Sequence, residues 1–329
     1  MPIIRKYPPN SRLPMTKKEL AKATDLLEKT KDLDWYHRFE VTLGSGLFTP
    51  GRLDTKGYSW RREFLGLTEE FLAGKRVLDI GPYSGAFSFL LQDLGAEVVA
   101  ADVYDPDYNG FNIVKEIRQR DLPHHQISVY DLDPKEIGTF DIVAFYGVHY
   151  HLRHPLLAFE RCNSVCKDGG LFVGGGTGLD SWFHDEDISC LNGVNFDALT
   201  SDKVNHKDIF SIDKISDLSL CGFVPGQFFK DKTNWFVPNL KCLLAWVESS
   251  GFEVSKSHKN SMPIPRDWNK ESKIKRTSLN FMATKRSEPP LEYTWKRMKQ
   301  FSIPIQSELD RLEKENAALK RKIARLQKK

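Results

Sequence analysis

The sequence lacks any apolar run near the roughly 18 consecutive residues that a membrane-spanning helix needs. Its first residues, Met-Pro-Ile-Ile-Arg-Lys-Tyr-Pro-Pro, also lack the apolar centre of a secretory signal peptide. We therefore expect no membrane span and a cytoplasmic protein. Apolar residues still make up 40% of the 329 positions, which is enough for a substantial globular core.

Cysteine is scarce and scattered along the chain. The cysteines are odd in number and form no C-x-x-C pair, so a disulfide framework or a cysteine-bound metal is not expected. Reduced thiols and no metal site are the simplest account of the five positions, Cys162, Cys166, Cys190, Cys221 and Cys242.

The body of the chain also lacks a basic excess. Of the 48 Lys and Arg and the 44 Asp and Glu residues, the tail 307–329 holds eight and four, which leaves 40 of each sign elsewhere. A domain that grips a long nucleic acid usually carries a basic surface. A nucleic-acid acceptor is therefore not favoured, although it stays open.

The stretch 76–105 has the pattern of a nucleoside-binding strand, turn, helix and strand. An apolar run leads into a turn bounded by Gly81 and Gly85, a helical segment follows, and a second apolar run ends at Asp102. Glycines let the backbone approach a ligand, and the start of a helix offers free N–H groups. A carboxylate at the tip of the second strand can accept hydrogen bonds from both ribose hydroxyls.

The same stretch lacks the middle glycine of a dinucleotide-binding fingerprint, because Tyr83 occupies that place. Asp79 stands two residues before Gly81, and the resulting D-x-G-x-x-x-G pattern is similar to that of S-adenosyl-L-methionine (SAM) methyltransferases. Their ligand has no pyrophosphate that would need so close an approach of the backbone. SAM is therefore the expected cofactor, and an ordinary turn in another α/β protein is the alternative.

Strand and helix patterns alternate after this unit and predict a parallel sheet that binds its ligand at the carboxyl ends of the strands. Strands are expected near 126–129, 140–146, 169–174, 252–256 and 278–285, and helices near 112–120, 156–166 and 240–250. A last strand that follows a hairpin-like insertion is typical of methyltransferase domains. We therefore predict an α/β fold with a Rossmann-like seven-stranded class I methyltransferase sheet in residues 71–290, with an insertion at 177–232.

Residues 1–70 are predicted to form a cap of helix and hairpin before the sheet. A helix over 15–33 is expected to begin with a capping box made by Thr16 and Glu19. An alternating run and its glycines then indicate a strand with a hairpin or lid. A second helix is expected over 60–72.

The segment 300–329 is predicted to be a C-terminal coiled coil. Its a and d positions are apolar with one exception, in the series Ile305, Leu309, Leu312, Asn316, Leu319, Ile323 and Leu326. An Asn at an a position favours a parallel two-stranded coil in register. We therefore expect a homo-oligomer through residues 305–329, either dimer or trimer, and a single solvated helix is the alternative.

The loop after the strand 140–146 supplies the candidate catalytic groups. Either His149 or His151 is predicted to be a general base, because imidazole titrates near neutral pH and can take a proton from a hydroxyl. Tyr150 is predicted to orient cofactor or acceptor. If the backbone stays extended, the two histidines share one face. Each of the three also has a plain interpretation as a packed or helix-capping residue.

With these segments placed, the chain resembles the carboxy-SAM-dependent tRNA wobble-uridine transferase family over about residues 35–285. The segment Tyr146-Gly-Val-His-Tyr-His-Leu-Arg-His-Pro is similar to the family's M-G-V-L-Y-H-R-R-S-P. Asn234-Trp-Phe-Val-Pro and Trp60-Arg61 are further matches. The wider group of class I methyltransferases, which includes enzymes of glycan and small-molecule pathways, resembles the chain at least as well.

The resemblance implies roles for particular residues. Tyr150 matches a tyrosine, and Arg276 an arginine, that touch the extra carboxylate of carboxy-SAM. A lysine of that family has no clean match here, although Arg38 or Arg61 lies near its place. The family's G-C-G-S-G loop is Gly81-Pro-Tyr-Ser-Gly here, which departs from its pattern.

We therefore predict a SAM-dependent methyltransferase that O-methylates a small-molecule or glycan acceptor. The alternatives are a tRNA wobble-uridine (carboxy)methyltransferase, with carboxy-S-adenosyl-L-methionine as cofactor, and a non-catalytic SAM-fold adaptor with a coiled-coil partner. The predicted cofactor contacts are Asp79, Gly81, Tyr83, Gly85, Asp102, Asp131, Tyr146, Gly147 and Arg61. The predicted substrate contacts are Arg38, Trp60 and Arg276.

Overall fold

The structure, a computed structural model, describes residues 15–42, 44–55, 58–180, 219–226, 231–262 and 276–286. All the described elements belong to one compact unit, Met1–Ser287. The predicted coiled coil, and most of the predicted insertion, lie outside the described residues. No helix in the described part of the chain is long and apolar enough to cross a membrane.

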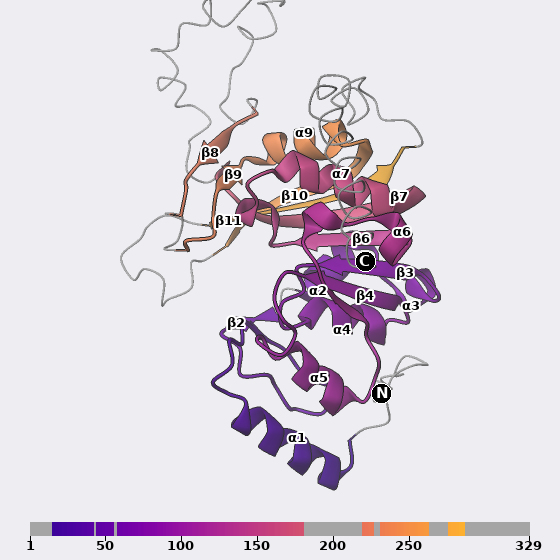
Figure 1. Cartoon of the computed structure of the whole chain (residues 1–329), viewed down its shortest axis with the longest axis vertical. Coiled ribbons are helices and arrows are strands. Elements are labelled where there is room, and N and C mark those ends of the chain that lie inside the picture. The colour runs from indigo at the N-terminus through magenta and orange to yellow at the C-terminus, as the bar shows by residue number, and fades with distance from the viewer. Residues whose placement is uncertain are drawn as a thin grey trace, which may run out of the picture. The chain divides into compact units, whose positions relative to one another are not determined.

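A seven-stranded sheet forms the centre of this unit (Figure 1). Its strands are β3 (Arg76–Ile80), β4 (Glu97–Asp102), β5 (His124–Gln126), β6 (Phe140–Tyr146), β7 (Cys166–Gly178), β10 (Phe252–Met262) and β11 (Arg276–Lys285). The strands lie in the order β10-β11-β7-β6-β3-β4-β5, and β11 runs antiparallel to both of its neighbours. The predicted seven-stranded sheet is confirmed, with its last strand inserted in reverse between the fifth and the sixth.

Helices cover both faces of the sheet. They are α1 (Lys17–Lys29), α2 (Tyr58–Leu65), α3 (Glu69–Leu72), α4 (Ala86–Asp93), α5 (Phe111–Arg118), α6 (Pro134–Ile137), α7 (Pro155–Val165) and α9 (Leu240–Ser249). Two further 3-10 turns are η2 (Val129–Asp131) and η3 (His149–His151), and short strand pairs are β1 (His37–Arg38) with β2 (Leu53–Asp54) and β8 (Cys221–Phe223) with β9 (Phe236–Pro238).

Alternating side chains of the strands build two separate hydrophobic cores. Val77 of β3 belongs to the core under α4 and α5, whereas its neighbour Leu78 belongs to the core under α7 and α9. This follows from the two-residue period of a strand, which sends successive side chains to opposite faces. Both faces are therefore covered, as expected for parallel strands that are apolar along their whole length.

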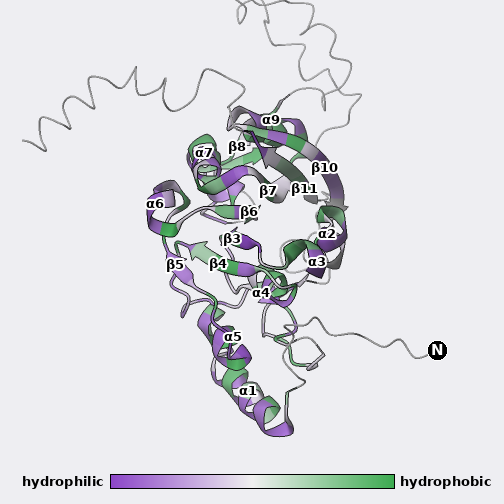
Figure 2. Cartoon of the chain, turned by 90° about the vertical axis from the view of Figure 1, so that its right-hand side faces the viewer, coloured by the Kyte–Doolittle hydropathy of each residue, from purple (hydrophilic) through white to green (hydrophobic). Residues whose placement is uncertain are grey.

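The N-terminal helix confirms its predicted capping box. The Thr16 hydroxyl accepts the Glu19 N–H, and the Glu19 carboxylate accepts the Thr16 N–H at 2.9 Å. This α1 helix packs against α5, and Figure 2 shows the two side by side with alternating hydrophilic and hydrophobic segments. The predicted hairpin is confirmed by an antiparallel bridge between Glu40 and Phe48 and by the Val41 N–H, which donates to the Leu47 carbonyl oxygen at 2.8 Å. In addition, β1 pairs in parallel with β2.

Several predicted boundaries differ from the structure for local reasons. The helix expected over 60–72 is two helices, because Gly66 with φ +66° ends the first and Thr68 caps the second. The strand expected near 126–129 lies at His124–Gln126, and Ser128 then caps η2. β7 and β10 are longer than predicted, since pairing with β11 extends both.

Candidate active site

The turn between β3 and α4 has a left-handed backbone at three positions. Gly81, Tyr83 and Gly85 have φ of +67°, +52° and +84°. Gly85 has no room for a side chain, because a Cβ there would lie 2.5 Å from the Phe89 ring. The turn thus presents backbone at the carboxyl end of β3, which is where open α/β sheets bind their ligands.

Asp102 lies at the end of β4 beside this turn. It is buried, and its carboxylate accepts the N–H of Tyr83 and the N–H of Tyr104, each at 3.1 Å. Each carboxylate oxygen has a second lone pair, so both can also accept a hydrogen bond from a ligand. Burial raises the pKa of Asp102, and the backbone N–H groups oppose this. The predicted position, at the strand tip next to the glycine turn, is the one that the structure shows.

Tyr83 joins the turn to the N-terminal segment. Its hydroxyl donates a short hydrogen bond to Asp34, and its ring lies edge-on to those of Tyr36 and Tyr104 at 6.0 and 5.5 Å. Burial raises the Tyr83 pKa, and the bond to Asp34 and its charge raise it further. The Tyr83 phenol therefore stays neutral. Tyr83 places an aromatic side chain beside Asp102, where the dinucleotide-binding fingerprint has a glycine.

Arg61 lies in a cluster of aromatic side chains on the other side of the turn. Its guanidinium carbon is 3.9 Å from the ring centroid of Tyr146 and 4.6 Å from that of Tyr58. Burial, followed by the nearby Arg61 charge, lowers the pKa of His37 to about 3, so His37 is neutral near pH 7. The positively charged Arg61 guanidinium therefore lies among uncharged rings, those of Tyr58, Tyr146 and His37.

Two buried polar atoms of this cluster have no hydrogen-bond partner among the described residues: the Tyr146 hydroxyl and His37 Nδ1. A buried donor or acceptor without a partner costs about 1–3 kcal/mol, so a ligand that satisfies both atoms is favoured. An anionic group beside Arg61 would also be attracted by its positive charge. The amino-acid end of SAM carries such a carboxylate, and the cluster therefore fits this cofactor.

Asp79 lies on β3, two residues before Gly81, and is 3% exposed. It forms a 2.6 Å hydrogen bond with the hydroxyl of Ser88 on α4. Burial raises the Asp79 pKa to about 7, while the bond to Ser88 and the charge of Arg61 lower it. The charge of Arg61 thus acts on the Asp79 carboxyl group, so these two predicted cofactor contacts lie near each other.

Asp79→Asn is expected to change the pH dependence of folding stability. The folded-state pKa lies above the unfolded value, so the folded protein holds the extra proton between about pH 4 and pH 7. The wild type therefore loses stability as the pH rises through this window, by up to about 4 kcal/mol, and the variant does not. Urea unfolding of both proteins at pH 4, 6 and 8 measures this. A stability difference that is the same at all three would contradict the assignment.

The loop after β6 is a 3-10 turn and not an extended segment. The extended backbone that would let His149 and His151 share one face is therefore not present. His149 is fully buried, and its Nε2 lies 3.1 Å from the Thr177 carbonyl oxygen. Since a carbonyl only accepts, Nε2 carries the proton in this contact. His149 thus lies inside the fold, and its role as a base stays a prediction.

His151 lies on the outer side of the same turn and is partly exposed. Its Nδ1 lies 2.8 Å from the hydroxyl of Thr233, which comes from the segment before β9. The ring of Tyr150 lies 4.4 Å from the His151 ring, and its hydroxyl is near Gly147, whose φ is +77°. Among the predicted catalytic residues, His151 is the one whose placement suits proton exchange with a ligand.

The remaining predicted site residues are not all brought to this place. The Arg38 guanidinium lies 4.4 Å over the Phe48 ring, and Trp60 stacks on Phe64 with centroids 5.2 Å apart.

Asp131 is exposed at the end of η2. Arg276 opens β11, and its side chain lies outside the described part of the chain. Within the described ranges, no three His, Cys, Asp or Glu side chains are grouped as metal ligands would be.

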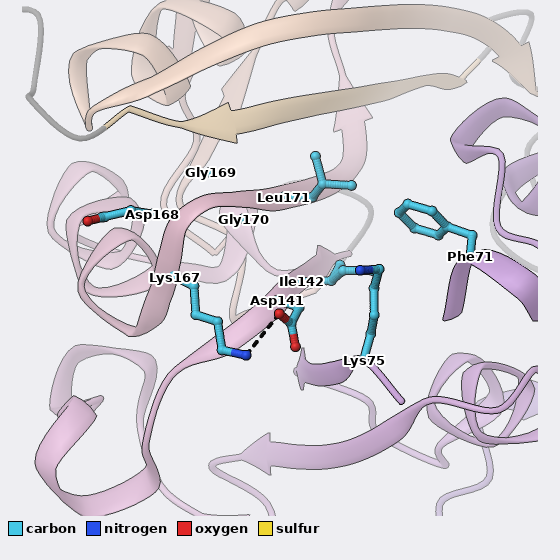
Figure 3. Close-up of a pocket in the computed structure, with 9 residues that line it drawn as sticks. All are labelled: Phe71, Lys75, Asp141, Ile142, Lys167, Asp168, Gly169, Gly170 and Leu171. Atoms are coloured by element: carbon cyan, nitrogen blue, oxygen red, sulfur yellow. Dashed lines mark hydrogen bonds and ion pairs between the residues drawn. The ribbon is translucent and has the colours of Figure 1, made fainter. Parts of the chain in front are cut away.

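A separate pocket of about 290 Å³ lies at the opposite edge of the sheet, where β3, β6 and β7 begin (Figure 3). Its polar lining includes Lys75 and the ion pair of Lys167 with Asp141, whose N–O distance is 2.8 Å. Ligands of open α/β sheets bind at the carboxyl ends of the strands, and this pocket is at their amino ends. We therefore do not assign it to the cofactor.

Two contributors to the site were not predicted from sequence. His37 sits in the alternating run after α1, and the alternation marked it only as a strand residue. Thr233 sits in a polar segment without any periodic pattern. The only sequence signal for it is the Asp-x-Thr spacing with Asp231, which is common in turns.

Comparison with known proteins adds to this geometry. A family profile described as "Methyltransferase domain" matches residues 54–218, half of the chain. The tRNA U34 carboxymethyltransferase of a Geobacter species is 25% identical over 203 residues, which cover 61% of this chain and 52% of that protein. The ubiquinone biosynthesis O-methyltransferase of Acinetobacter baylyi is 30% identical over 100 residues, or 30% of this chain and 42% of that protein.

The chain thus spans about half the length of the curated relatives it matches. Among solved structures, the N-terminal domain of EvdMO1, crystallised in the presence of SAH and D-fucose, has a TM-score of 0.50 at 16% identity. That likeness covers 83% of this chain and 98% of that one, and it concerns the fold. The profile match over half of the sequence shows that the chain belongs to the methyltransferase-domain family, and its fold is the Rossmann-like seven-stranded sheet.

Proposed function

We propose that the protein is a SAM-dependent O-methyltransferase that acts on a hydroxyl of a small-molecule or glycan acceptor. The observation that carries this proposal is His151, a partly exposed imidazole held by Thr233 at the carboxyl end of β6. A hydroxyl is a poor nucleophile until a base takes its proton, whereas imidazole can take that proton near neutral pH. The relative from Acinetobacter baylyi, an O-methyltransferase by name, is consistent with this chemistry.

In this proposal the residues of the chain have separate tasks. Asp102 would accept the ribose hydroxyls, and Arg61 with the Tyr146 hydroxyl would bind the amino-acid carboxylate of the cofactor. The glycine turn would let the backbone approach. His151 would hold the acceptor proton at Nε2, and Tyr150 would limit how the acceptor lies. SAM supplies an electrophilic methyl group when it is bound, so the protein needs mainly to position and deprotonate the acceptor.

The donor proposed here is SAM rather than carboxy-SAM. A carboxylated donor brings a second negative charge, and we would expect a second cation near Arg61 to bind it. The Arg38 guanidinium lies over Phe48 instead. The side chain of Arg276, the other candidate, lies outside the described residues. Carboxy-SAM therefore stays as the alternative cofactor.

A tRNA wobble-uridine transferase is the second candidate function. Its support is the 25% identity to the Geobacter protein over 203 residues. The equal numbers of acidic and basic residues outside the tail 307–329 weigh against a long anionic acceptor. A non-catalytic adaptor is a third candidate, and the buried polar atoms that suit a cofactor weigh against it.

The domain boundaries are part of the proposal. Residues 1–70 would cap the site, 71–290 would form the methyltransferase domain with the insertion 177–232, and 300–329 would form the coiled coil. Oligomerisation through 305–329 would make the protein a dimer or trimer.

A methyl-transfer assay tests the proposed function. Purified full-length protein is incubated with methyl-labelled SAM and, separately, with sugar nucleotides, phenolic acceptors and unmodified tRNA, and the products are analysed by mass spectrometry. The proposal predicts a gain of one methyl group on a hydroxyl of a small molecule or glycan. Transfer only to tRNA would support the second candidate, and no SAM binding would support the adaptor.

A further inference from the structure

The segment 231–234 forms a tight turn that is fixed by its own side chains. The Asp231 carboxylate accepts both the N–H of Thr233 at 2.8 Å and the hydroxyl of Thr233 at 2.5 Å. The Asn234 N–H donates to the Asp231 carbonyl at 3.3 Å, and the Gly226 N–H donates to the Asn234 carbonyl at 2.8 Å. These contacts fix the Thr233 hydroxyl so that it donates its proton to Asp231.

This turn is also fixed to the catalytic loop. The Trp235 N–H donates to the Tyr150 carbonyl at 2.7 Å, and the Arg153 guanidinium lies 4.1 Å over the Trp235 ring. Two contacts on either side of His151 thus hold the turn against η3. The 2.8 Å contact between Thr233 and His151 is therefore part of a built arrangement rather than a chance meeting of surface side chains.

The direction of the Thr233 hydroxyl determines the tautomer of His151. A hydroxyl has one proton, and here it is donated to a carboxylate oxygen of Asp231. The Thr233 oxygen must then accept from His151, so Nδ1 carries the ring proton. The lone pair of neutral His151 is consequently on Nε2. This assignment follows from the hydrogen-bond network, as is usual for histidine.

The charge of Asp231 also acts at a distance on Tyr104, near Asp102. The Tyr104 pKa is raised first by partial burial, then by the charge of Asp102, and further by Tyr108, Asp231 and Asp34. Tyr104 is two residues after Asp102, the last residue of β4. Among the described residues, those that contact the His151 ring include Thr233 and the neighbouring Tyr150, and Asp231 acts on it through Thr233.

We propose that Asp231 and Thr233 are positioning residues that hold His151 in the Nδ1–H tautomer, so that Nε2 takes the proton of the acceptor hydroxyl. The proposal rests on the proposed function, in which His151 is the base. The proton moves from the acceptor oxygen to Nε2 and later to solvent, while the oxygen keeps its electron pair for the new bond. The resulting imidazolium is stabilised by the Asp231 carboxylate through Thr233.

The tautomer can be measured without any turnover. Full-length protein labelled with ¹⁵N at histidine is examined by long-range ¹H–¹⁵N spectroscopy at pH 8.5, and the His151 signal is assigned by its loss in His151→Gln. The wild type and Thr233→Ser are expected to show the Nδ1–H tautomer. Thr233→Val should shift most of His151 to the Nε2–H form. Nε2–H in the wild type, or no change in Thr233→Val, would overturn the proposal.

Kinetics then test the catalytic meaning of the relay. Thr233→Val and Asp231→Ala should lower kcat by about 10–100-fold with KM and SAH affinity unchanged, while Thr233→Ser recovers most of the rate. Asp231→Asn keeps an acceptor but loses the charge, so the acidic limb of its kcat profile should move to lower pH. The matched control is Lys232→Ala, an exposed residue of the same turn.

The outcomes separate the relay from the proposed function. Wild-type rates in Thr233→Val would overturn the relay even where methyl transfer is confirmed. An Nδ1–H tautomer that depends on Thr233, in a protein that transfers no methyl group to any acceptor, would contradict the proposed function and support the hydrogen-bond relay.

Discussion

Replacing His151 by alanine is expected to lower kcat for methyl transfer by about 10²–10⁴-fold, the usual range for loss of a general base. The dissociation constant for SAH should stay within about twofold, because His151 lies on β6's loop and not among the residues proposed to hold the cofactor. Stopped assays of product formation, with SAH binding measured separately by calorimetry, give both quantities.

His154→Ala is the matched control for this variant. His154 is an exposed histidine of the same loop. Its backbone N–H donates to the Tyr130 hydroxyl at 3.0 Å and its carbonyl oxygen accepts the Ala158 N–H at 3.2 Å, and the substitution leaves both backbone groups in place. It should turn over at the wild-type rate. If His151→Ala does so too, the histidine-base mechanism is wrong, and the acceptor must be deprotonated by another group or by water.

Replacing Arg61 by methionine is expected to weaken SAH binding by about 10–100-fold. A charge-assisted hydrogen bond to a carboxylate is worth about 1.5–3 kcal/mol, and methionine keeps the packing against Tyr58 and Tyr146 while removing the charge. Arg61→Lys should recover part of the affinity. Calorimetric titration with SAH measures all three proteins.

The control for Arg61 is Arg120→Met, which removes an arginine that pairs with Asp93 at 3.2 Å near the end of α5. It should bind SAH as the wild type does. A normal affinity in Arg61→Met would show that the cluster around Tyr146 is a structural feature of the fold. The carboxylate of the cofactor would then have to bind elsewhere.

Local sequence signals predicted the part of the site that is contiguous in the chain. The run from Asp79 to Asp102 carries its glycines, its apolar strands and its carboxylate within one unit, and the structure places these residues as expected. The sheet was predictable for the same reason, because buried parallel strands are apolar along their length. Such patterns need no knowledge of distant contacts.

The chemistry of the loop could not be predicted in the same way. No sequence pattern distinguishes His149 from His151. The 3-10 turn places His149 against Thr177 in the core and His151 against Thr233. Both partners come from segments that are far away in the chain. His37 likewise joins Arg61 only through tertiary packing. Residue pairs of this kind carry no periodic signal, so the structure is needed to find them.

The central claim is that the turn Gly81–Gly85 and Asp102 form a SAM site, and direct titration with SAH tests it most closely. Calorimetry of the full-length wild type should give one SAH per chain. Asp102→Ala should weaken this binding by about 10–100-fold, since it removes the acceptor proposed for the ribose hydroxyls. No binding of SAH or SAM to the wild type, or equal affinity in Asp102→Ala, would contradict the account.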